Sequence, residues 1–487
     1  MADTTHKTTN PWKIFAVLLI GGFMALLDVT IVNVALPSMQ TGLQASSSAL
    51  EWIVAGYALT LGLSLIPAGR IGDNIGHRQT FLAGMAVFTV ASLLCSIAQT
   101  PTQIIIARLL QGVGAGIFQP AITSYIQLLF QGKDRSKAFG IFGAIIGLSS
   151  ALGPLVGGLL VQSGGADLGW RLVFLVNVPI GIALLPLAYK MLPRNEHVGR
   201  RKHGLDPIGL TLLSAGLLLV LVPLIEGQQL DWPLWTFVCL ITALPVFFAL
   251  WQWERRLDDA SQEPVLPIHL LRQRNFLAGC ILALVYFASF TSIFFTLSIL
   301  WQSGFAHNAL ATGLAIVPFA LGSMVAAAQS HKLSERLGRR ILAIGTGLVS
   351  LGLILTLVVL SEAQAPFSSW LLFGPLLIAG IGNGLFIAPN QDFILAGVER
   401  RDAGAAAGVL STAQRIGSSL GIAAIGTLLF SHITVQGNGA QAVAEGFSHG
   451  AQAAFVLNIA LILVSFMLVF ALPKNLGNNA HAVEPAN

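Results

Sequence analysis

The stretch "LLDVTIVNVALP", residues 26–37, decides the fold because it ends an apolar run that contains one charge. Between Lys13 and Pro37 the only charged side chain is Asp28. At about 1.5 Å per residue, a helix over this run crosses a hydrocarbon core about 30 Å thick. The run is too long for the apolar part of a signal peptide, so we interpret it as a membrane-spanning helix.

The composition extends this interpretation to the whole chain. The 487 residues are 55% hydrophobic and 10% charged, with a mean hydropathy of +0.77. Soluble domains carry about 25% charged residues, so we predict an all-α integral membrane protein. The predicted spans are fourteen: 13–37, 49–69, 80–99, 102–129, 137–162, 171–191, 207–226, 234–252, 276–300, 309–330, 341–360, 370–395, 404–430 and 451–472.

The basic residues orient these spans. If the N-terminus is cytoplasmic, only Arg108, Arg171 and Arg415 of the 26 basic residues lie away from the cytoplasmic side. An excess of positive charge inside is the rule for membrane proteins. The nine tryptophans fall at or near predicted span ends, as an interfacial belt would. We therefore expect both termini in the cytoplasm and assign the net charge of +5 to membrane orientation rather than to nucleic-acid binding.

The three cysteines, Cys95, Cys239 and Cys280, lie within predicted spans and form no C-x-x-C pair. This spacing argues against a disulfide framework or a metal site. Free cysteines are commonly buried, so we interpret all three as packing residues.

Two cytoplasmic loops repeat one pattern, in "GRIGDNIGHR" (69–78) and "HKLSERLGRR" (331–340). The shared frame is acid-x-x-Gly-x-Arg, formed by Asp73, Gly76 and Arg78 and by Glu335, Gly338 and Arg340. Any inside loop is basic, but the matching frame favours an internal repeat. We predict two six-helix halves, 1–192 and 276–487, joined by a two-helix insert, 193–275, which is a transporter arrangement.

Five blocks along the chain now carry a family resemblance. They are "LLDVTIVNVALP" (26–37), "GRIGDNIGHR" (69–78), "RLLQGVGAG" (108–116), "GLSSALGPLVGG" (147–158) and "WRLVFLVNVPIG" (170–181). In this order and at these spans, they resemble the fourteen-helix drug:proton antiporter family of the major facilitator superfamily. The resemblance implies a bundle that works by alternating access, in a bacterial inner (plasma) membrane.

The resemblance also implies roles for the cytoplasmic loops and the fifth span. A conformational latch would be formed by Gly69, Asp73, Gly76, Arg78, Glu335 and Arg340. Asn74 and His77 stand where a basic residue is common, which would weaken this latch. The antiporter motif would comprise Gly147, Gly153, Pro154, Gly157 and Gly158, since small residues let helices approach closely and proline favours a bend.

Asp28 is the only acid deep within a predicted span, whereas Glu51, Glu226 and Glu362 fall at span edges where water would solvate them. Acids inside membranes are functional hypotheses by default. Its expected partner is Arg108, which the resemblance links to proton coupling. Desolvation favours the neutral carboxyl and a nearby arginine favours the ionised one, so their balance would let Asp28 bind and release a proton. A purely structural hydrogen bond is the alternative.

Other polar residues within the spans are candidates for a substrate cavity. They are Asn33, Gln111, Asn177, Asn383, Asn390, Gln391 and Arg415. Asn33 lies roughly 140° around the helix from Asp28, so the two are expected to face different neighbours. The role of Arg415, far from either end of its span, stays open.

These features predict a proton-coupled antiporter that exports hydrophobic or amphipathic compounds. The alternative is a specific exporter of a metabolite or natural product with the same fold. An enzyme is not expected, because neither H-E-x-x-H nor a His/Asp cluster is present. A phosphate-binding loop is also missing, so we expect no cofactor and a proton gradient as the energy source.

The expected partners are small-molecule substrates, protons and membrane lipids. The chain is expected to work as a monomer, and recruitment of a periplasmic adaptor stays open. The two-helix insert is interpreted as a spacer or lipid-facing element.

Overall fold

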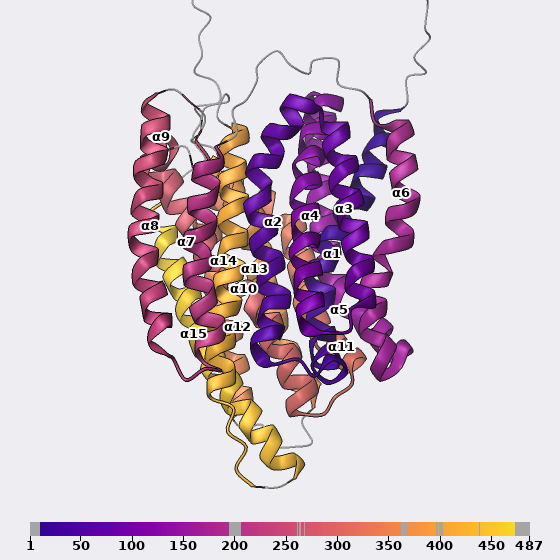
Figure 1. Ribbon diagram of the computed structural model, residues 1–487, viewed down its shortest axis with the longest axis vertical. Coiled ribbons are helices and arrows are strands. Elements are labelled where there is room, and N and C mark those ends of the chain that lie inside the picture. Colours follow the sequence, from indigo (N-terminus) through magenta and orange to yellow (C-terminus); the bar gives the residue numbers. More distant parts are fainter. Residues whose placement is uncertain are drawn as a thin grey trace, which may run out of the picture.

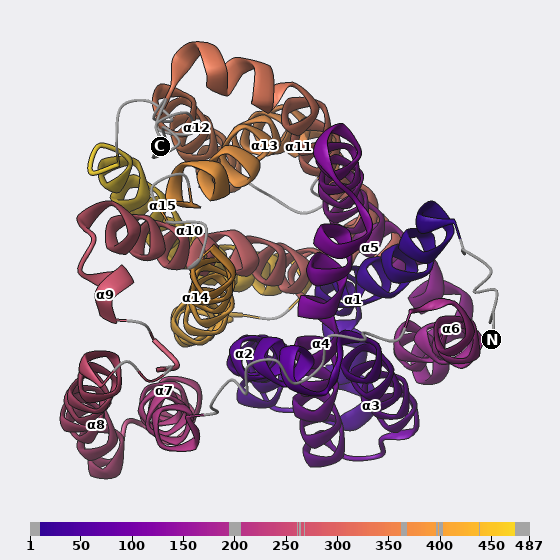
Figure 2. The same cartoon turned by 90° about the horizontal axis from the view of Figure 1, so that it is seen from above.

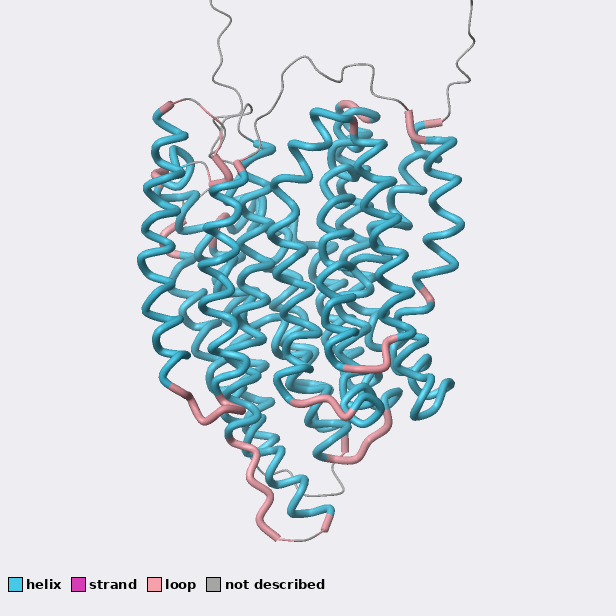
Figure 3. Tube along the Cα trace, viewed as in Figure 1, coloured by secondary structure: helices cyan, strands magenta, loops and turns pink. Residues whose placement is uncertain are grey.

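The computed structural model describes residues 10–193, 206–260, 262, 264–266, 268–361, 368–395, 398, 403–437 and 439–472. Within the helices, the side chains of Asp73 and Glu335 are among those that lie outside the description. All regular structure in the described residues is helical, arranged as a bundle of long rods (Figure 1, Figure 3).

The helices of the first part and the insert are α1 (Pro11–Leu43), α2 (Ser47–Ile75), α3 (His77–Ile97), α4 (Pro101–Leu129), α5 (Gly132–Leu175), α6 (Asn177–Met191), α7 (Pro207–Gly227) and α8 (Leu234–Asp259). The remaining elements are α9 (Ile268–Leu271), α10 (Arg274–Ile299), the π-helix η1 (Leu300–Gly304), α11 (Ala309–Leu337), α12 (Arg340–Ser361), the 3₁₀ helix η2 (Ser369–Leu372), α13 (Phe373–Leu395), α14 (Ala403–Ser431) and α15 (Ala440–Val469).

Thirteen helices of the described chain are long and apolar enough to cross a membrane, and their positions match thirteen of the predicted spans. The fifth predicted span, 137–162, lies in the first arm of α5. The predicted loop between the fifth and sixth spans is shorter than expected, since it consists of a sharp break at Gly165 between two helical arms. The chain remains helical to Leu175 and bends sharply at Gly165, where φ is 67° and glycine carries no steric penalty.

The last predicted span was also too short at its start, because α15 begins at Ala440 rather than at residue 451. The extra turns have the sequence "AQAVAEGFSHG". Alanine, glutamine and glutamate favour helix, but they are not apolar enough to be identified by hydropathy. The helix therefore extends beyond the predicted membrane-crossing segment.

The packing pattern of the first six long helices recurs in the last six. In the first set α1 packs against α5, and α2 and α3 pack against α4. In the last set α10 packs against α14, and α11 and α12 pack against α13. Glycine pairs allow equivalent close contacts: a Cβ on Gly84 would lie 2.8 Å from the oxygen of Gly114, and one on Gly345 would lie 2.8 Å from that of Gly382.

The two most extensive contacts between these sets of helices are those of α5 with α11 and of α2 with α14, and we name them the α5–α11 seam and the α2–α14 seam. Figure 2, which looks down the bundle from above, shows α5 beside α11 and α2 beside α14. The insert helices α7 and α8 pack against each other at the periphery, and α7 contacts α14 and α2. The outer face of α8 is apolar and exposed, with Leu234, Phe237, Leu244 and Phe248 on it.

Arginine side chains hold the helix ends together at one end of the bundle, which we call the basic end. Arg70 donates to the carbonyl of Pro264, and Arg78 donates to that of Tyr189 near the end of α6. Both ends of the described chain lie toward this end (Figure 1). At the opposite end, Arg171 donates to the carbonyls of Ser96 and Ala98, where α3 ends, at 2.9 and 2.6 Å.

Candidate functional site

Asp28 lies at the centre of a polar cluster in the interior of the first helix set. Its side chain is 0% exposed, and its Oδ2 lies 2.5 Å from Nη1 of Arg108. Its Oδ1 accepts hydrogen bonds of 3.0 Å from Gln111 and of 3.0 Å from Asn177. We call these four residues the Asp28 cluster. They come from α1, α4 and α6, so the carboxylate ties together three helices that are far apart in the sequence.

Arg108 turns into the protein rather than toward the membrane surface. Its side chain is 1% exposed, and its guanidinium lies 4.0 Å above the ring of Tyr57. Its Nε donates to the carbonyl of Ile53 at 3.0 Å, and its Nη1 also donates to Gln111 at 2.6 Å. A buried ion pair is tolerated when its remaining donors and acceptors are satisfied in this way. The predicted pairing of Arg108 with Asp28 therefore has its geometric basis here.

Two neighbours hold Gln111 in place. Its Nε2 also donates to the hydroxyl of Ser92 at 2.8 Å. The next residue, Gly112, lets α4 approach α2, because a Cβ there would lie 2.5 Å from the Tyr57 carbonyl oxygen. The sequence motif around Arg108 thus combines a polar anchor with a close helix contact. Ser92 and Tyr57 were not predicted, since a lone hydroxyl within a span carries no sequence signal.

The cluster can couple a proton to a change in packing. With Asp28 ionised, its charge is balanced by Arg108 and its oxygens accept three hydrogen bonds. A proton on Asp28 removes the counter-charge and leaves a buried guanidinium, which is unfavourable unless Arg108 finds other partners. A neutral Asp28 would therefore favour another arrangement of α1, α4 and α6 than an ionised Asp28 does.

The other predicted cavity residues do not join the cluster. Asn33 donates to the carbonyl of Val29 in its own helix at 3.2 Å. Asn383 accepts from Tyr286 at 2.7 Å and donates to Ser323 at 2.8 Å, which forms a separate network in the second helix set. Asn390 is buried without a hydrogen bond to the described residues, whereas Gln391 is exposed.

Arg415 lies half-buried in the α2–α14 seam. A Cβ on Gly62 would lie 2.7 Å from the Cβ of Arg415. The base of the Arg415 side chain therefore lies where α2 and α14 approach each other closely. Thr412 donates to the carbonyl of Gly62 at 3.1 Å, and Ser419 donates to that of Ala55 at 2.9 Å. Arg415 thus lies between two interhelix hydrogen bonds in which it takes no part.

The predicted latch has matching backbone turns in its two copies. Gly76 ends α2 with φ 104°, and Gly338 ends α11 with φ 55°, a region that favours glycine. Arg78 also stacks on the ring of Tyr189 at 4.5 Å. In the second copy Arg340 is exposed, and its neighbour Arg339 makes the equivalent contacts. Arg339 donates to the carbonyls of Phe470 and Leu472, at 2.8 and 2.5 Å.

The remaining residues of the predicted latch are Gly69, Asp73 and Glu335. Gly69 has open space around it, with nothing within 4 Å of a Cβ built there. The predicted roles of Asp73 and Glu335 concern side chains outside the described ones.

The fifth-span motif faces two different neighbours. A Cβ on Gly153 or Gly157 would meet α1, in the latter case 2.8 Å from the oxygen of Ile31. A Cβ on Gly158 would meet α11, 2.7 Å from the oxygen of Ala309. Pro154 lies in the same seam, with its carbonyl oxygen 2.3 Å from a Cβ built on Gly313 of α11. Gly147 lies in the helical arm of α5, and Gly158 and Pro154 are the members at the α5–α11 seam.

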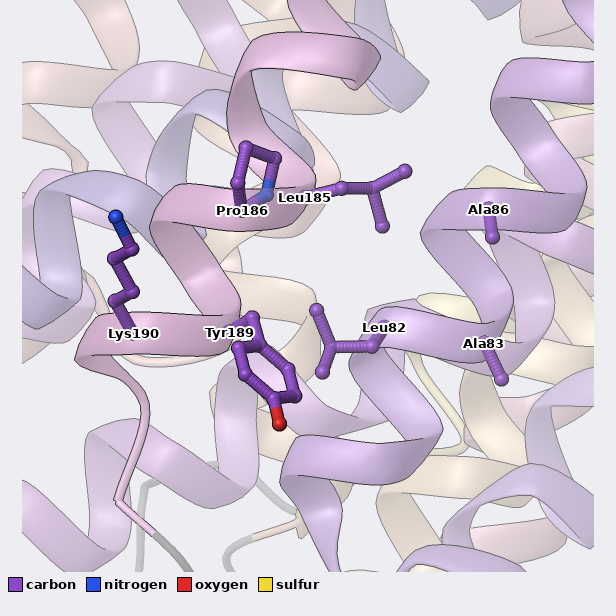
Figure 4. A pocket seen from close by; sticks show the side chains of 7 residues that line it. All are labelled: Leu82, Ala83, Ala86, Leu185, Pro186, Tyr189 and Lys190. Atoms are coloured by element: carbon purple, nitrogen blue, oxygen red, sulfur yellow. The ribbon is translucent and has the colours of Figure 1, made fainter.

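A groove of about 620 Å³ lies between α3 and α6 on the outside of the bundle. Figure 4 shows its seven lining side chains, which are Leu82, Ala83, Ala86, Leu185, Pro186, Tyr189 and Lys190. The lining is almost wholly apolar, and it includes no member of the Asp28 cluster. This groove suits lipid chains rather than the chemistry of a proton site.

A bundle of membrane-crossing helices with a buried carboxylate–guanidinium pair is typical of multi-span membrane transporters. The comparison with known families agrees. The family described as Major Facilitator Superfamily matches residues 18–422, and the chain belongs to this superfamily.

The relatives are named as transporters or as antibiotic resistance proteins. The probable actinorhodin transporter of Streptomyces coelicolor is 34% identical over 420 residues, covering 86% of this chain and 72% of the relative. The tetracenomycin C resistance and export protein of Streptomyces glaucescens is 31% identical over 428 residues, covering 87% and 77%.

A solved structure supports the fold alone. The crystal structure of a bacterial homolog of the human lysosomal transporter Spinster has a TM-score of 0.66 at 15% identity. The likeness covers 99% of this chain and 100% of that one.

Proposed function

We propose that the protein is a proton-coupled antiporter that exports hydrophobic or amphipathic compounds by alternating access, with Asp28 as the proton carrier. The observation that carries the proposal is the buried pair of Asp28 and Arg108, with Gln111 and Asn177 on the same carboxylate. The cluster is neutral with the proton released and positive with the proton bound. Such a group can bind a proton on one side of the membrane and release it on the other.

The architecture supports movement of two halves. We propose the division 1–192, 193–275 and 276–487, because the packing pattern recurs in the first and last parts. The thirteen candidate spans and the first arm of α5 would make fourteen crossings. We place both termini in the cytoplasm and the protein in the inner (plasma) membrane, because the basic end would then face inward.

The two seams suggest which side is closed in this conformation. At the end opposite the basic one, a Cβ on Gly426 would lie 2.6 Å from Cδ of Glu51, and Gly158 lies against Ala309. Toward the basic end, a Cβ on Gly408 would lie 3.7 Å from Ile66, and one on Gly69 would meet nothing within 4 Å. The halves are therefore packed tightly at the outer end, which leaves the inner end to receive substrate.

In the proposed cycle, an external proton reaches Asp28 when the outer seams have opened. Neutral Asp28 releases Arg108, and the rearranged helices favour return to the conformation closed outside. Loss of the proton to the cytoplasm restores the pair and permits the next substrate to bind. Each inward proton contributes about 2.3 kcal/mol per 100 mV of membrane potential, in addition to the pH gradient.

A narrower function is the second candidate. The relatives are named for single antibiotics, which favours a specific exporter of a natural product in the same fold. Growth inhibition measured across a broad panel of compounds separates the two, since a specific exporter protects against one chemical class. We propose that neither function requires a cofactor and that the monomer is the working unit. Recruitment of a periplasmic adaptor is compatible with both functions.

The proposed function is tested with purified protein in liposomes. An imposed pH gradient, with the acid side inside the liposomes, should drive accumulation of a transported dye inside them, because outward proton flow is exchanged for inward dye. Collapse of the gradient by a protonophore should abolish accumulation. Equal accumulation with and without the gradient would contradict proton coupling. Accumulation that requires added ATP would indicate ATP rather than the proton gradient as the energy source.

A further inference from the structure

The charges inside the described bundle do not cancel. Away from helix ends, the charged side chains of the helix interior are Asp28 and Arg108, which neutralise each other, and Arg415. Glu51 is buried near the outer end of α2 and lies against Gly426. The middle of the α2–α14 seam therefore carries one net positive charge.

Arg415 has no anionic partner in the part of the chain that the structure describes. No hydrogen bond or ion pair joins it to a described residue, and its electrostatic neighbour is the neutral phenol of Tyr57. The Asp28 carboxylate is unavailable, because its oxygens are already held by Arg108, Gln111 and Asn177. Arg415 lies twelve residues from the start of α14 and sixteen from its end, which argues against snorkelling to either surface.

An uncompensated guanidinium at membrane depth is costly, and it is retained where it serves ions or substrates. The matching ligand group is a carboxylate, phenolate, sulfonate or other anion, because guanidinium binds planar oxyanions through charge-assisted hydrogen bonds. A cationic compound would meet net repulsion at the same place.

We propose that Arg415 is the recognition residue for an acidic group on the exported compound, so that the substrates are amphipathic anions. The inference rests on the proposed export function and names its substrate class. The position suits this role. Arg415 lies where the two halves meet, and it is partly accessible between the hydrogen bonds of Thr412 and Ser419. An anion bound there would contact a residue whose surroundings change when the seam opens.

Two dyes that share one ring system test the proposal. Fluorescein is an anion at neutral pH and rhodamine 123 is a cation, and fluorescence polarisation measures binding of each to the purified full-length protein. The wild-type protein should bind fluorescein at least about tenfold more tightly, the scale of one charge-assisted hydrogen bond. Arg415→Gln should weaken fluorescein binding by about tenfold or more and leave rhodamine 123 within about threefold.

Matched variants keep the result specific. Arg415→Lys retains the charge and should restore part of the fluorescein affinity. Arg255→Gln removes an arginine that is half-exposed at the end of α8 and should change neither affinity. If Arg415→Gln failed to fold, the wild-type preference and the Arg415→Lys variant would still decide the matter.

The proposal is overturned if the wild-type protein binds rhodamine 123 as tightly as fluorescein or binds neither dye. It is also overturned if Arg415→Gln weakens both dyes equally, which would indicate a packing role. The binding assay contains no proton gradient. Its failure is therefore separate from failure of the liposome assay, which alone bears on proton coupling.

Discussion

A methyl group added at Gly158 should shift the balance between the two conformations of the proposed transport cycle. The Cβ of Gly158→Ala would lie 2.7 Å from the carbonyl oxygen of Ala309 and 2.8 Å from the Cα of Leu310. Ordinary contacts begin at about 3.4 Å, so the α5–α11 seam must widen by about 0.6 Å or more. Overpacking of this kind costs about 1–3 kcal/mol.

This penalty applies only while the outer seam is closed. The equilibrium should therefore move toward the outward-open conformation by about 5- to 150-fold. The adjacent Gly157→Ala is a matched control, because its Cβ would lie 2.8 Å from the oxygen of Ile31 in the same half. It should reduce stability without changing the balance between conformations.

Spin labels at the outer end measure this balance by double electron–electron resonance. Thr41 and Val435 are exposed there on opposite halves, and Cys239 is replaced by serine so that the buried cysteines alone remain. Gly158→Ala should enlarge the long-distance population, whereas Gly157→Ala should not. Equal responses of the two variants, or an unchanged distribution for Gly158→Ala, would refute the assignment of Gly158 to the moving seam.

Three further predictions concern the polar residues. Gln111→Leu removes a hydrogen-bond donor from Asp28 and should reduce gradient-driven export into everted vesicles by about tenfold. Asn33→Leu removes an amide that bonds only its own helix and should change export by less than about twofold. Equal losses in the two variants would contradict the role of the Asp28 cluster. Arg339→Ala should lower the melting temperature by about 1–2 °C, the scale of about 1 kcal/mol in a chain of this length, and Arg340→Ala should leave it unchanged. The reverse order would restore Arg340 as the equivalent of Arg78. Glu51→Gln replaces a buried acid whose Oε2 has no hydrogen-bond partner among the described residues, so thermal unfolding at pH 8 should occur at the same or a higher temperature. A clearly lower unfolding temperature would indicate that the charge of Glu51 stabilises the fold.

The sequence predicted the helices and the pairing of Asp28 with Arg108 because both depend on strong signals. Apolar runs of about 20 residues have few alternatives in a membrane. An acid and an arginine buried in neighbouring spans are each unfavourable alone, which makes their pairing a physical expectation. The hydrogen bond from Asn177 to Asp28 was not predicted, because it depends on how α1, α4 and α6 approach one another, which no local pattern carries.

Other features depended on three-dimensional contacts that no local pattern carries. Glu51 lies one turn into α2 and was expected in interfacial water, yet it is 2% exposed because Gly426 lets α14 cover it. The second latch arginine was assigned to Arg340 by spacing, although Arg339 faces the end of α15. Gly157 and Gly158 are alike in sequence but face different halves, since successive helical residues point about 100° apart.

The most direct measurement of the central claim is substrate-dependent proton flux through Asp28→Asn. In everted vesicles, addition of a transported compound to the wild-type protein should release protons from the interior, seen as recovery of a quenched pH-gradient dye. The variant should give no such flux, while exchange of labelled for unlabelled substrate, which moves no net protons, should persist and show that it is folded. Substrate-dependent proton flux at the wild-type level in Asp28→Asn would contradict the assignment of Asp28 as the proton carrier.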